Sequence, residues 1–127
     1  MVNTQDRKSD TPRESLAHQI NVQRTYMKAI KSGKLKFGQF YDPSLKSRSK
    51  DQLLSKLKKA DKELMSLLRK ESNLRKRIVV PWNKDGIGTI QMLWAMDSHE
   101  ILHTGWNIAL MDHLNIPRFE KLKKTWG

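Results

Sequence analysis

The chain has 127 residues, enough for one domain with a single core, and 37% of them are hydrophobic and 30% charged. It has no cysteine, which excludes disulfides, thiolate metal ligands and a cysteine nucleophile, and no run of the roughly 18 to 20 apolar residues that a membrane span needs. The net charge of +12 predicts a surface that attracts polyanions, and the polar N-terminus, which lacks an apolar signal core, favours a cytoplasmic location.

The first predicted helix covers residues 12–32. Thr11 is a good N-cap, Pro12 suits the first helical position, and Glu14 completes a Thr-x-x-Glu capping box. Apolar residues recur near helical spacing through the segment, and Gly33 is a natural stop. These signals predict a helix with defined ends.

A second helix is predicted over about 50–72, after a loop at 33–48 that is rich in glycine, proline and serine. Ser49 opens another capping box, which Gln52 completes. Its apolar stripe is expected to face the core and comprises Leu53, Leu54, Leu57, Ala60, Leu64, Met65, Leu67 and Leu68.

The stretch RIVVPWNKDGIG at 77–88 breaks the helical pattern, because Pro81 and the glycines do not suit a helix interior. A third helix is predicted over 89–113, ended by Asn115 and Pro117. A helix apolar over so much of its circumference is expected to be central, with neighbours on several sides. One apolar face comprises Ile90, Leu93, Trp94, Ile101 and Ile108, and a second comprises Met92, Met96, Trp106 and Leu110.

No strand pair is evident in this pattern, so the predicted class is all-α. We expect an up-and-down helical bundle with three long helices in this chain. Residues 1–11 are predicted to be a flexible tail, residues 12–127 a single helical-bundle domain, and residues 118–127 a short basic segment at its end.

The second helix lies in the most basic part of the chain. Residues 46–77 contain twelve Lys/Arg against four Asp/Glu. One interpretation is a nucleic-acid- or polyanion-binding helical module, although this helix has few aromatics for base stacking. The other is a solvated helix face on a basic protein. Both remain open at this point.

The third helix carries the sequence HEILH. His99 and His103 are four residues apart, so they share one helix face, and that face is the second apolar stripe listed above. A metal ion bound by both imidazole rings would compensate for their burial. The alternative is that the two rings form hydrogen bonds with neighbouring side chains or backbone groups. His18, in the second turn of the first helix, would complete three nitrogen ligands with an open position, as in catalytic zinc or nickel sites. His113, near the helix end, is expected to be structural.

HEILH also matches H-E-x-x-H, the zinc-protease motif. The metzincin motif continues after the second histidine with a glycine and a third histidine at fixed positions. Here Gly105 comes one residue before the glycine position, and Ala109 stands at the position of the third histidine. A protease is therefore a minor alternative. Glu100 points about 100° away from His99 around the helix, and is the candidate for catalytic proton handling or for orienting a ligand. It could equally be a polar neighbour.

Two stretches, SLAHQINVQRTYMKAI and MDSHEILHTGWNIALMDHLNIP, resemble the DinB/YfiT-like family of metal-binding helical bundles. His18, His99 and His103 stand at positions that match the family's three metal ligands. Gly105 matches a family glycine, and LNIP resembles the terminal signature. The resemblance covers roughly residues 12–120.

This resemblance implies a four-helix bundle whose first helix is short or absent here, and a homodimer that could complete it. It also implies a divalent metal, zinc or nickel, and a function as a metal-dependent hydrolase or as a transferase that uses a small thiol co-substrate. Thr104 and Trp106 stand where the family favours Arg and Gln. These two departures put the substrate contacts in doubt more than the metal.

Overall fold

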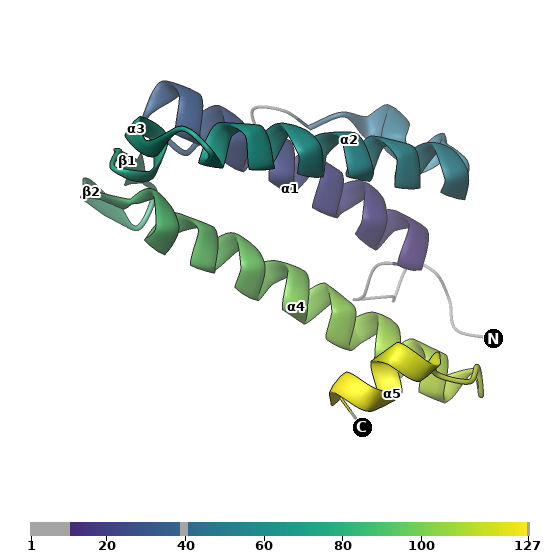
Figure 1. Ribbon diagram of the computed structural model, residues 1–127. Coiled ribbons are helices and arrows are strands. Elements are labelled where there is room, and N and C mark those ends of the chain that lie inside the picture. The colour runs from purple at the N-terminus through teal and green to yellow at the C-terminus, as the bar shows by residue number, and fades with distance from the viewer. Residues whose placement is uncertain (1–10, 39–40, 127) are drawn as a thin grey trace.

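In the computed structural model, three long helices lie along one another and a small hairpin closes one end (Figure 1). The structure describes residues 11–38 and 41–126; the predicted tail, apart from Thr11, lies outside them. Within these residues, no helix combines the length and the apolar character that crossing a membrane requires. The elements are α1 (Pro12–Ser32), the 3-10 helix η2 (Pro43–Ser47), α2 (Lys50–Leu68), α3 (Glu71–Leu74), β1 (Arg77–Val80), β2 (Asn83–Gly88), α4 (Thr89–His113) and α5 (Glu120–Trp126).

The predicted ends of α1 are confirmed. The Glu14 backbone N–H donates to Thr11 Oγ1 at 3.2 Å, and the Thr11 N–H donates to the Glu14 carboxylate at 3.1 Å, which completes the capping box. At the other end Gly33 has φ 79°, a conformation that favours glycine, and its N–H donates to the Ala29 carbonyl at 2.8 Å. Local signals therefore define this helix completely.

The helix predicted over 50–72 is shorter in the structure. Its capping box between Ser49 and Gln52 is present, but α2 ends at Leu68. The one-turn helix α3 follows after a change of direction, where the Asn73 side chain donates to the Leu67 carbonyl at 2.8 Å. The segment after Pro117, predicted only as basic, contains the short helix α5.

The expectation of an up-and-down bundle is wrong for the first two helices, because α1 and α2 run parallel (Figure 1). Leu45 and Leu53 pack on Ala17 and Ile20 near the start of α1, whereas Leu64 packs in the cluster around its end. The 33–48 segment is long enough for this return, since an extended residue spans about 3.3 Å and a helical residue rises only about 1.5 Å. α4 runs antiparallel to both helices.

The absence of strands was also predicted wrongly. β1 and β2 form an antiparallel hairpin in which Ile78 pairs with Ile87. Ile78 is fully buried and Val80 nearly so, while Val79 between them is exposed, so β1 alternates about the core. The Val79 backbone also bonds to Gly33 and Leu35, which ties the hairpin to the end of α1. A four-residue strand is too short to be distinguished by periodicity from a broken helix.

The central helix is α1 rather than α4. It packs against both α2 and α4, whereas α2 and α4 hardly touch each other. On α4, Met92, Met96 and His103 are buried against α1 and the hairpin. The face with Ile90 and Trp94 is exposed, so the expectation that α4 has neighbours on several sides is wrong for this chain.

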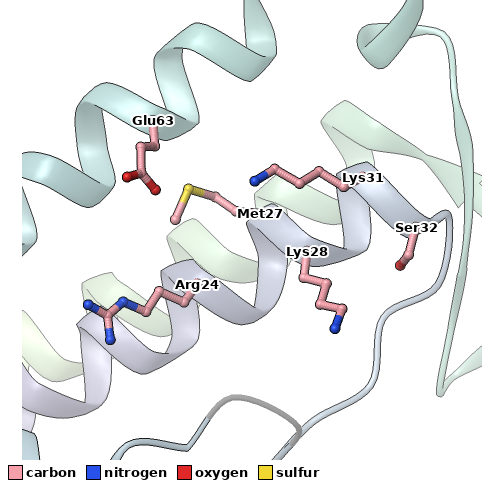
Figure 2. Close-up of a pocket in the computed structure, with 6 residues that line it drawn as sticks. All are labelled: Arg24, Met27, Lys28, Lys31, Ser32 and Glu63. Carbon is pink, nitrogen blue, oxygen red and sulfur yellow. The ribbon is translucent and has the colours of Figure 1, made fainter.

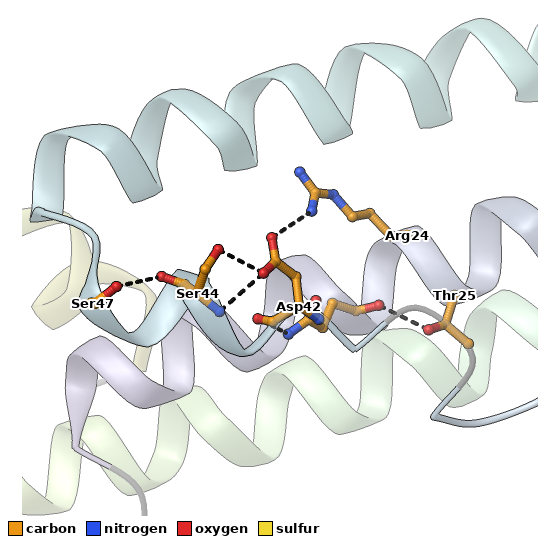
Figure 3. Close-up of polar contacts among 6 residues, drawn as sticks. Arg24, Thr25, Asp42, Ser44 and Ser47 are labelled. Carbon is orange, nitrogen blue, oxygen red and sulfur yellow. Dashed lines mark hydrogen bonds and ion pairs between the residues drawn. The ribbon is translucent and has the colours of Figure 1, made fainter.

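Asp42 fastens the 33–48 segment to α1 (Figure 3). Its carboxylate accepts bonds from the Ser44 hydroxyl at 2.6 Å and the Ser44 N–H at 2.9 Å, and Arg24 lies 3.9 Å away. The Asp42 N–H in turn donates to the Asn21 side chain at 3.0 Å. The Ser44 hydroxyl, the Ser44 N–H and then Arg24 lower the pKa of Asp42 below its usual 3.8.

Asp42→Ala is expected to lower the melting temperature by a few degrees at neutral pH, because η2 loses its N-cap acceptor. A carboxyl with a lowered folded-state pKa stabilises the fold above its unfolded pKa and loses this effect as the pH falls through the folded value. The difference from the wild type should therefore be constant above about pH 5 and shrink below pH 3.8. Thermal melts from pH 2 to 7 measure it, with the exposed Asp85→Ala as control. A difference that persists unchanged at pH 2 contradicts this assignment.

Candidate metal centre

Three histidines from two helices meet between α1 and α4. His99 Nε2 lies 3.1 Å from His18 Nε2 and 3.2 Å from His103 Nε2. His18 and His99 are 81 positions apart in the chain, so only the packing of α1 against α4 brings them together. The three residues predicted as ligands therefore lie close enough to bind one metal ion.

The spacing of the nitrogens fits a single ion. Two imidazole nitrogens that each lie about 2.0–2.1 Å from one divalent metal are about 3 to 3.5 Å apart. The two separations from His99 Nε2 fall in this range, and the three rings offer ligand atoms within 4.8 Å of one another. A set of three neutral nitrogens suits zinc, nickel or a similar divalent ion.

His103 is held in place by Ser15 of α1. Its Nδ1 lies 3.0 Å from the Ser15 hydroxyl, and both residues are buried. In the tautomer whose Nδ1–H donates to Ser15, Nε2 keeps its lone pair for the metal. Trp106 also packs on the His103 ring, with ring centroids 4.9 Å apart in an edge-to-face arrangement. The ring is thus oriented before any ion binds.

His99 is prepared for binding by its surroundings. Burial, then the neighbouring His103 and His18, lower the pKa of His99 below 6.5, so the neutral, ligand-competent form dominates at neutral pH. Its Nδ1 is buried and has no hydrogen-bond partner among the described residues. Ligating histidines usually donate this second N–H to a neighbour, so a water molecule could serve here.

Ser15→Ala is expected to weaken metal affinity by about 10- to 100-fold, because His103 loses the partner that fixes its orientation. Calorimetric titration with Zn²⁺ measures the change. Ser98→Ala is the matched control: it removes an exposed hydroxyl from α4 whose one bond within the described residues is to the Trp94 carbonyl. If Ser15→Ala and Ser98→Ala bound Zn²⁺ with equal affinity, Ser15 would have no role in metal binding.

Glu100 lies one residue from His99 but bonds elsewhere. Gln23 Nε2 donates to Glu100 Oε1 at 3.2 Å and to Asp61 at 2.9 Å, so this amide links all three long helices. Burial raises the pKa of Glu100, Asp61 and Asp97 raise it further, and the Gln23 bond opposes them. The geometry gives Glu100 a role in holding α4 against α1, beside the predicted role in proton handling.

A small cavity of about 220 Å³ opens beside His18. Val22, Phe37 and Tyr41 give it an apolar, aromatic wall. A second hollow of about 130 Å³ adjoins it and also borders His18 and Tyr41. The room next to His18 suits a small group with an apolar part, and neither His99 nor His103 lines it.

A basic cleft of about 460 Å³ lies away from the histidines, between α1 and α2 (Figure 2). Arg24, Lys28 and Lys31 line it along α1, and Glu63 points toward it from α2. This cleft favours the polyanion-binding alternative, and its positive charges come from α1. The basic second helix lines a separate hollow of about 510 Å³ with Lys56 and Lys59, next to Arg48.

Two further predicted features are placed by the fold. His113 is exposed at the end of α4 and is not part of the histidine cluster. Both strands of the described residues belong to the hairpin, which directly precedes α4. The second strand, β2, ends about three helical turns before His99. It therefore does not flank the histidines as the sheet of a zinc protease would.

Sequence reasoning missed Ser15 and Gln23. Ser15 precedes His18 by one helical turn, so it could have been found as a polar residue on the same face. Gln23 has no sequence signal, because its partners lie 38 and 77 positions away.

Comparison with protein-family models, curated proteins and solved structures finds no match to the chain.

Proposed function

We propose that this protein binds one divalent metal ion, zinc or nickel, through His18, His99 and His103, as the resemblance to DinB/YfiT-like bundles implies. The observation that supports it most is that His99 Nε2 lies at distances from the other two Nε2 atoms that fit a single ion, and that the three rings offer ligand atoms within 4.8 Å of one another. Three neighbouring imidazoles without an ion could satisfy only part of their hydrogen-bonding capacity, and His99 Nδ1 is already without a partner among the described residues.

The chemistry would be that of a metal-dependent hydrolase or of a transferase that uses a small thiol. When bound, a divalent ion with three protein ligands lowers the pKa of a water or thiol in its open position. The chain's own residues orient the reaction: Ser15 and Trp106 hold His103, and Phe37 and Tyr41 wall the cavity beside His18 for the apolar part of a substrate. Glu100 is the candidate for proton transfer if it leaves Gln23.

The test begins with metal content. Purified protein is expected to carry close to one zinc or nickel ion per chain, and chelation should lower its melting temperature. At a free metal concentration 100 times Kd, binding contributes about 2.7 kcal/mol to stability. Loaded protein is then assayed with ester substrates, and with an electrophile plus a small thiol. Absence of stoichiometric metal after titration would overturn the metal proposal; turnover in one assay distinguishes hydrolase from transferase.

The second candidate function is binding of nucleic acid or another polyanion, which the basic cleft favours. Its affinity would fall steeply with salt, because phosphate contacts release counterions. A gel shift with short duplex DNA at 50 and 200 mM salt tests this. Binding that survives loss of all three histidines but not reversal of Arg24, Lys28 and Lys31 to glutamate would favour this function over the metal proposal.

A further inference from the structure

Two exposed aromatic rings lie next to each other at the hairpin end of the bundle. Trp82 lies in the turn between β1 and β2 and is 53% exposed, and Phe37 lies on the segment after α1 and is 59% exposed. Their ring centroids are 6.4 Å apart and their planes differ by 22°. Tyr26, a buried residue of α1, packs on Phe37 with ring centroids 6.3 Å apart. The two rings are therefore nearly parallel, and Phe37 is supported from the interior.

The backbone next to these rings holds the two segments together. Lys34 forms a parallel bridge with Val79, and the Leu35 N–H donates to the Val79 carbonyl at 2.8 Å. Phe37 comes three residues after Lys34, and Trp82 comes three residues after Val79. The bridge thus brings two rings from distant parts of the chain to the same place.

The segments that carry the rings contain basic residues and no acidic ones. Residues 28–37 contain four lysines, residues 76–84 contain three Lys/Arg, and neither segment contains Asp or Glu. Lys34, Lys36 and Lys84 are exposed, and each lies within three residues of one of the rings. Lys31, which lines the basic cleft, precedes Lys34 by one turn of chain around Gly33. Positive charge therefore continues from the cleft to the two rings.

A ligand that fits this surface carries negative charge and flat aromatic groups. Lysines attract phosphates, and the faces of Trp and Phe rings stack on nucleobases. The base faces are covered by neighbouring pairs in a duplex, whereas unstacked bases of a single strand can lie on an aromatic side chain. A phosphate polymer without bases would use the lysines and leave both rings in water. The second helix has few aromatics for base stacking, but the fold supplies them here.

We propose that the Phe37–Trp82 pair and the lysines beside it bind single-stranded nucleic acid. Bases stack on the two rings, and phosphates lie at Lys34, Lys36 and Lys84. The nearly parallel ring planes match the parallel planes of neighbouring bases in one strand. This site does not depend on metal binding. It differs from polyanion binding in the basic cleft, because the rings, and not charge alone, select the ligand.

Fluorescence anisotropy of the full chain with labelled 12-nucleotide oligo(dT) and oligo(U) tests the ligand class. A 12-base-pair DNA duplex and inorganic polyphosphate are the competitors. At least one of the single strands is expected to bind about 10-fold more tightly than the duplex, and the tighter of the two tells DNA from RNA. Its affinity should fall by about 20-fold between 50 and 200 mM salt if three phosphates are neutralised.

Trp82→Leu is expected to weaken single-strand binding by about 10-fold, because a base loses the ring on which it stacks, whereas Trp82→Phe should retain most of the affinity. Trp94→Leu is the matched control, since it removes an exposed tryptophan of α4 outside the two basic segments. Oligonucleotide binding should also quench tryptophan fluorescence in the wild type and in Trp94→Leu, but much less in Trp82→Leu. Circular dichroism and a Zn²⁺ titration of Trp82→Leu should match the wild type.

Three results would overturn the proposal. Single strand, duplex and polyphosphate may bind equally and independently of Trp82, which leaves polyanion binding by the basic cleft intact. The chain binds none of them at 50 mM salt, which removes both. Trp82→Leu and Trp94→Leu lose affinity equally, which removes the ring pair alone. If Trp82→Leu does not fold, the exposed Lys84→Glu replaces it: single-strand affinity should fall several-fold, and an unchanged affinity rejects the site.

Discussion

His99→Ala is expected to abolish stoichiometric binding of zinc or nickel, with a fall in affinity of more than about 100-fold. His99 Nε2 is the nitrogen that lies 3.1 Å from His18 and 3.2 Å from His103, so its loss leaves two ligands on opposite helices. Loss of a partner that only orients a ligand already costs about 10- to 100-fold, and loss of the ligand itself should cost more. Calorimetry and metal analysis after dialysis measure the effect.

The matched control is His113→Ala, which removes an exposed imidazole from the end of the same helix. It should keep both the stoichiometry and the affinity of the wild type. If His113→Ala reduced binding as much as His99→Ala, metal would be bound by surface imidazoles rather than by the cluster. A melt without metal shows whether His99→Ala leaves the fold intact.

Ile78→Ala is expected to destabilise the fold by about 2–5 kcal/mol, because a large aliphatic side chain is removed from a fully buried position. Ile78 lies on β1 and packs in the cluster that joins the ends of α1 and α2 to Met92 of α4. The hairpin is therefore part of the core rather than a surface connection. Urea unfolding, followed by circular dichroism, measures the change.

Val79→Ala is the control, since this side chain is next in the same strand and points out of the core. Its backbone bonds to Gly33 and Leu35 do not involve the side chain, so the substitution should cost less than about 1 kcal/mol. Equal losses for Ile78→Ala and Val79→Ala would mean that β1 does not alternate about the core as the structure has it.

The starts of α1 and α2, the end of α1 and the ligand candidates could be predicted from the sequence because their signals are local. The capping boxes of Thr11 and Ser49 and the stop at Gly33 use residues within one turn of each other, and all three are present in the structure. The HEILH spacing puts His99 and His103 on one face of any helix. His18 was the candidate third ligand from its place on the first helix, and the family resemblance supported it, but no local rule links it to α4.

Tertiary structure decided the features that depend on residues far apart in the chain. The direction of α2, the pairing of the hairpin and the bond from Ser15 to His103 follow from which surfaces are buried together, and burial has no short-range signature. The same holds for the exposed α4 face. The apolar pattern of α4 predicted that the helix is buried on several sides, but other elements of this chain cover only part of its surface. A periodic pattern reports that a surface is apolar, and only the packed structure shows which part of that surface the rest of the chain covers.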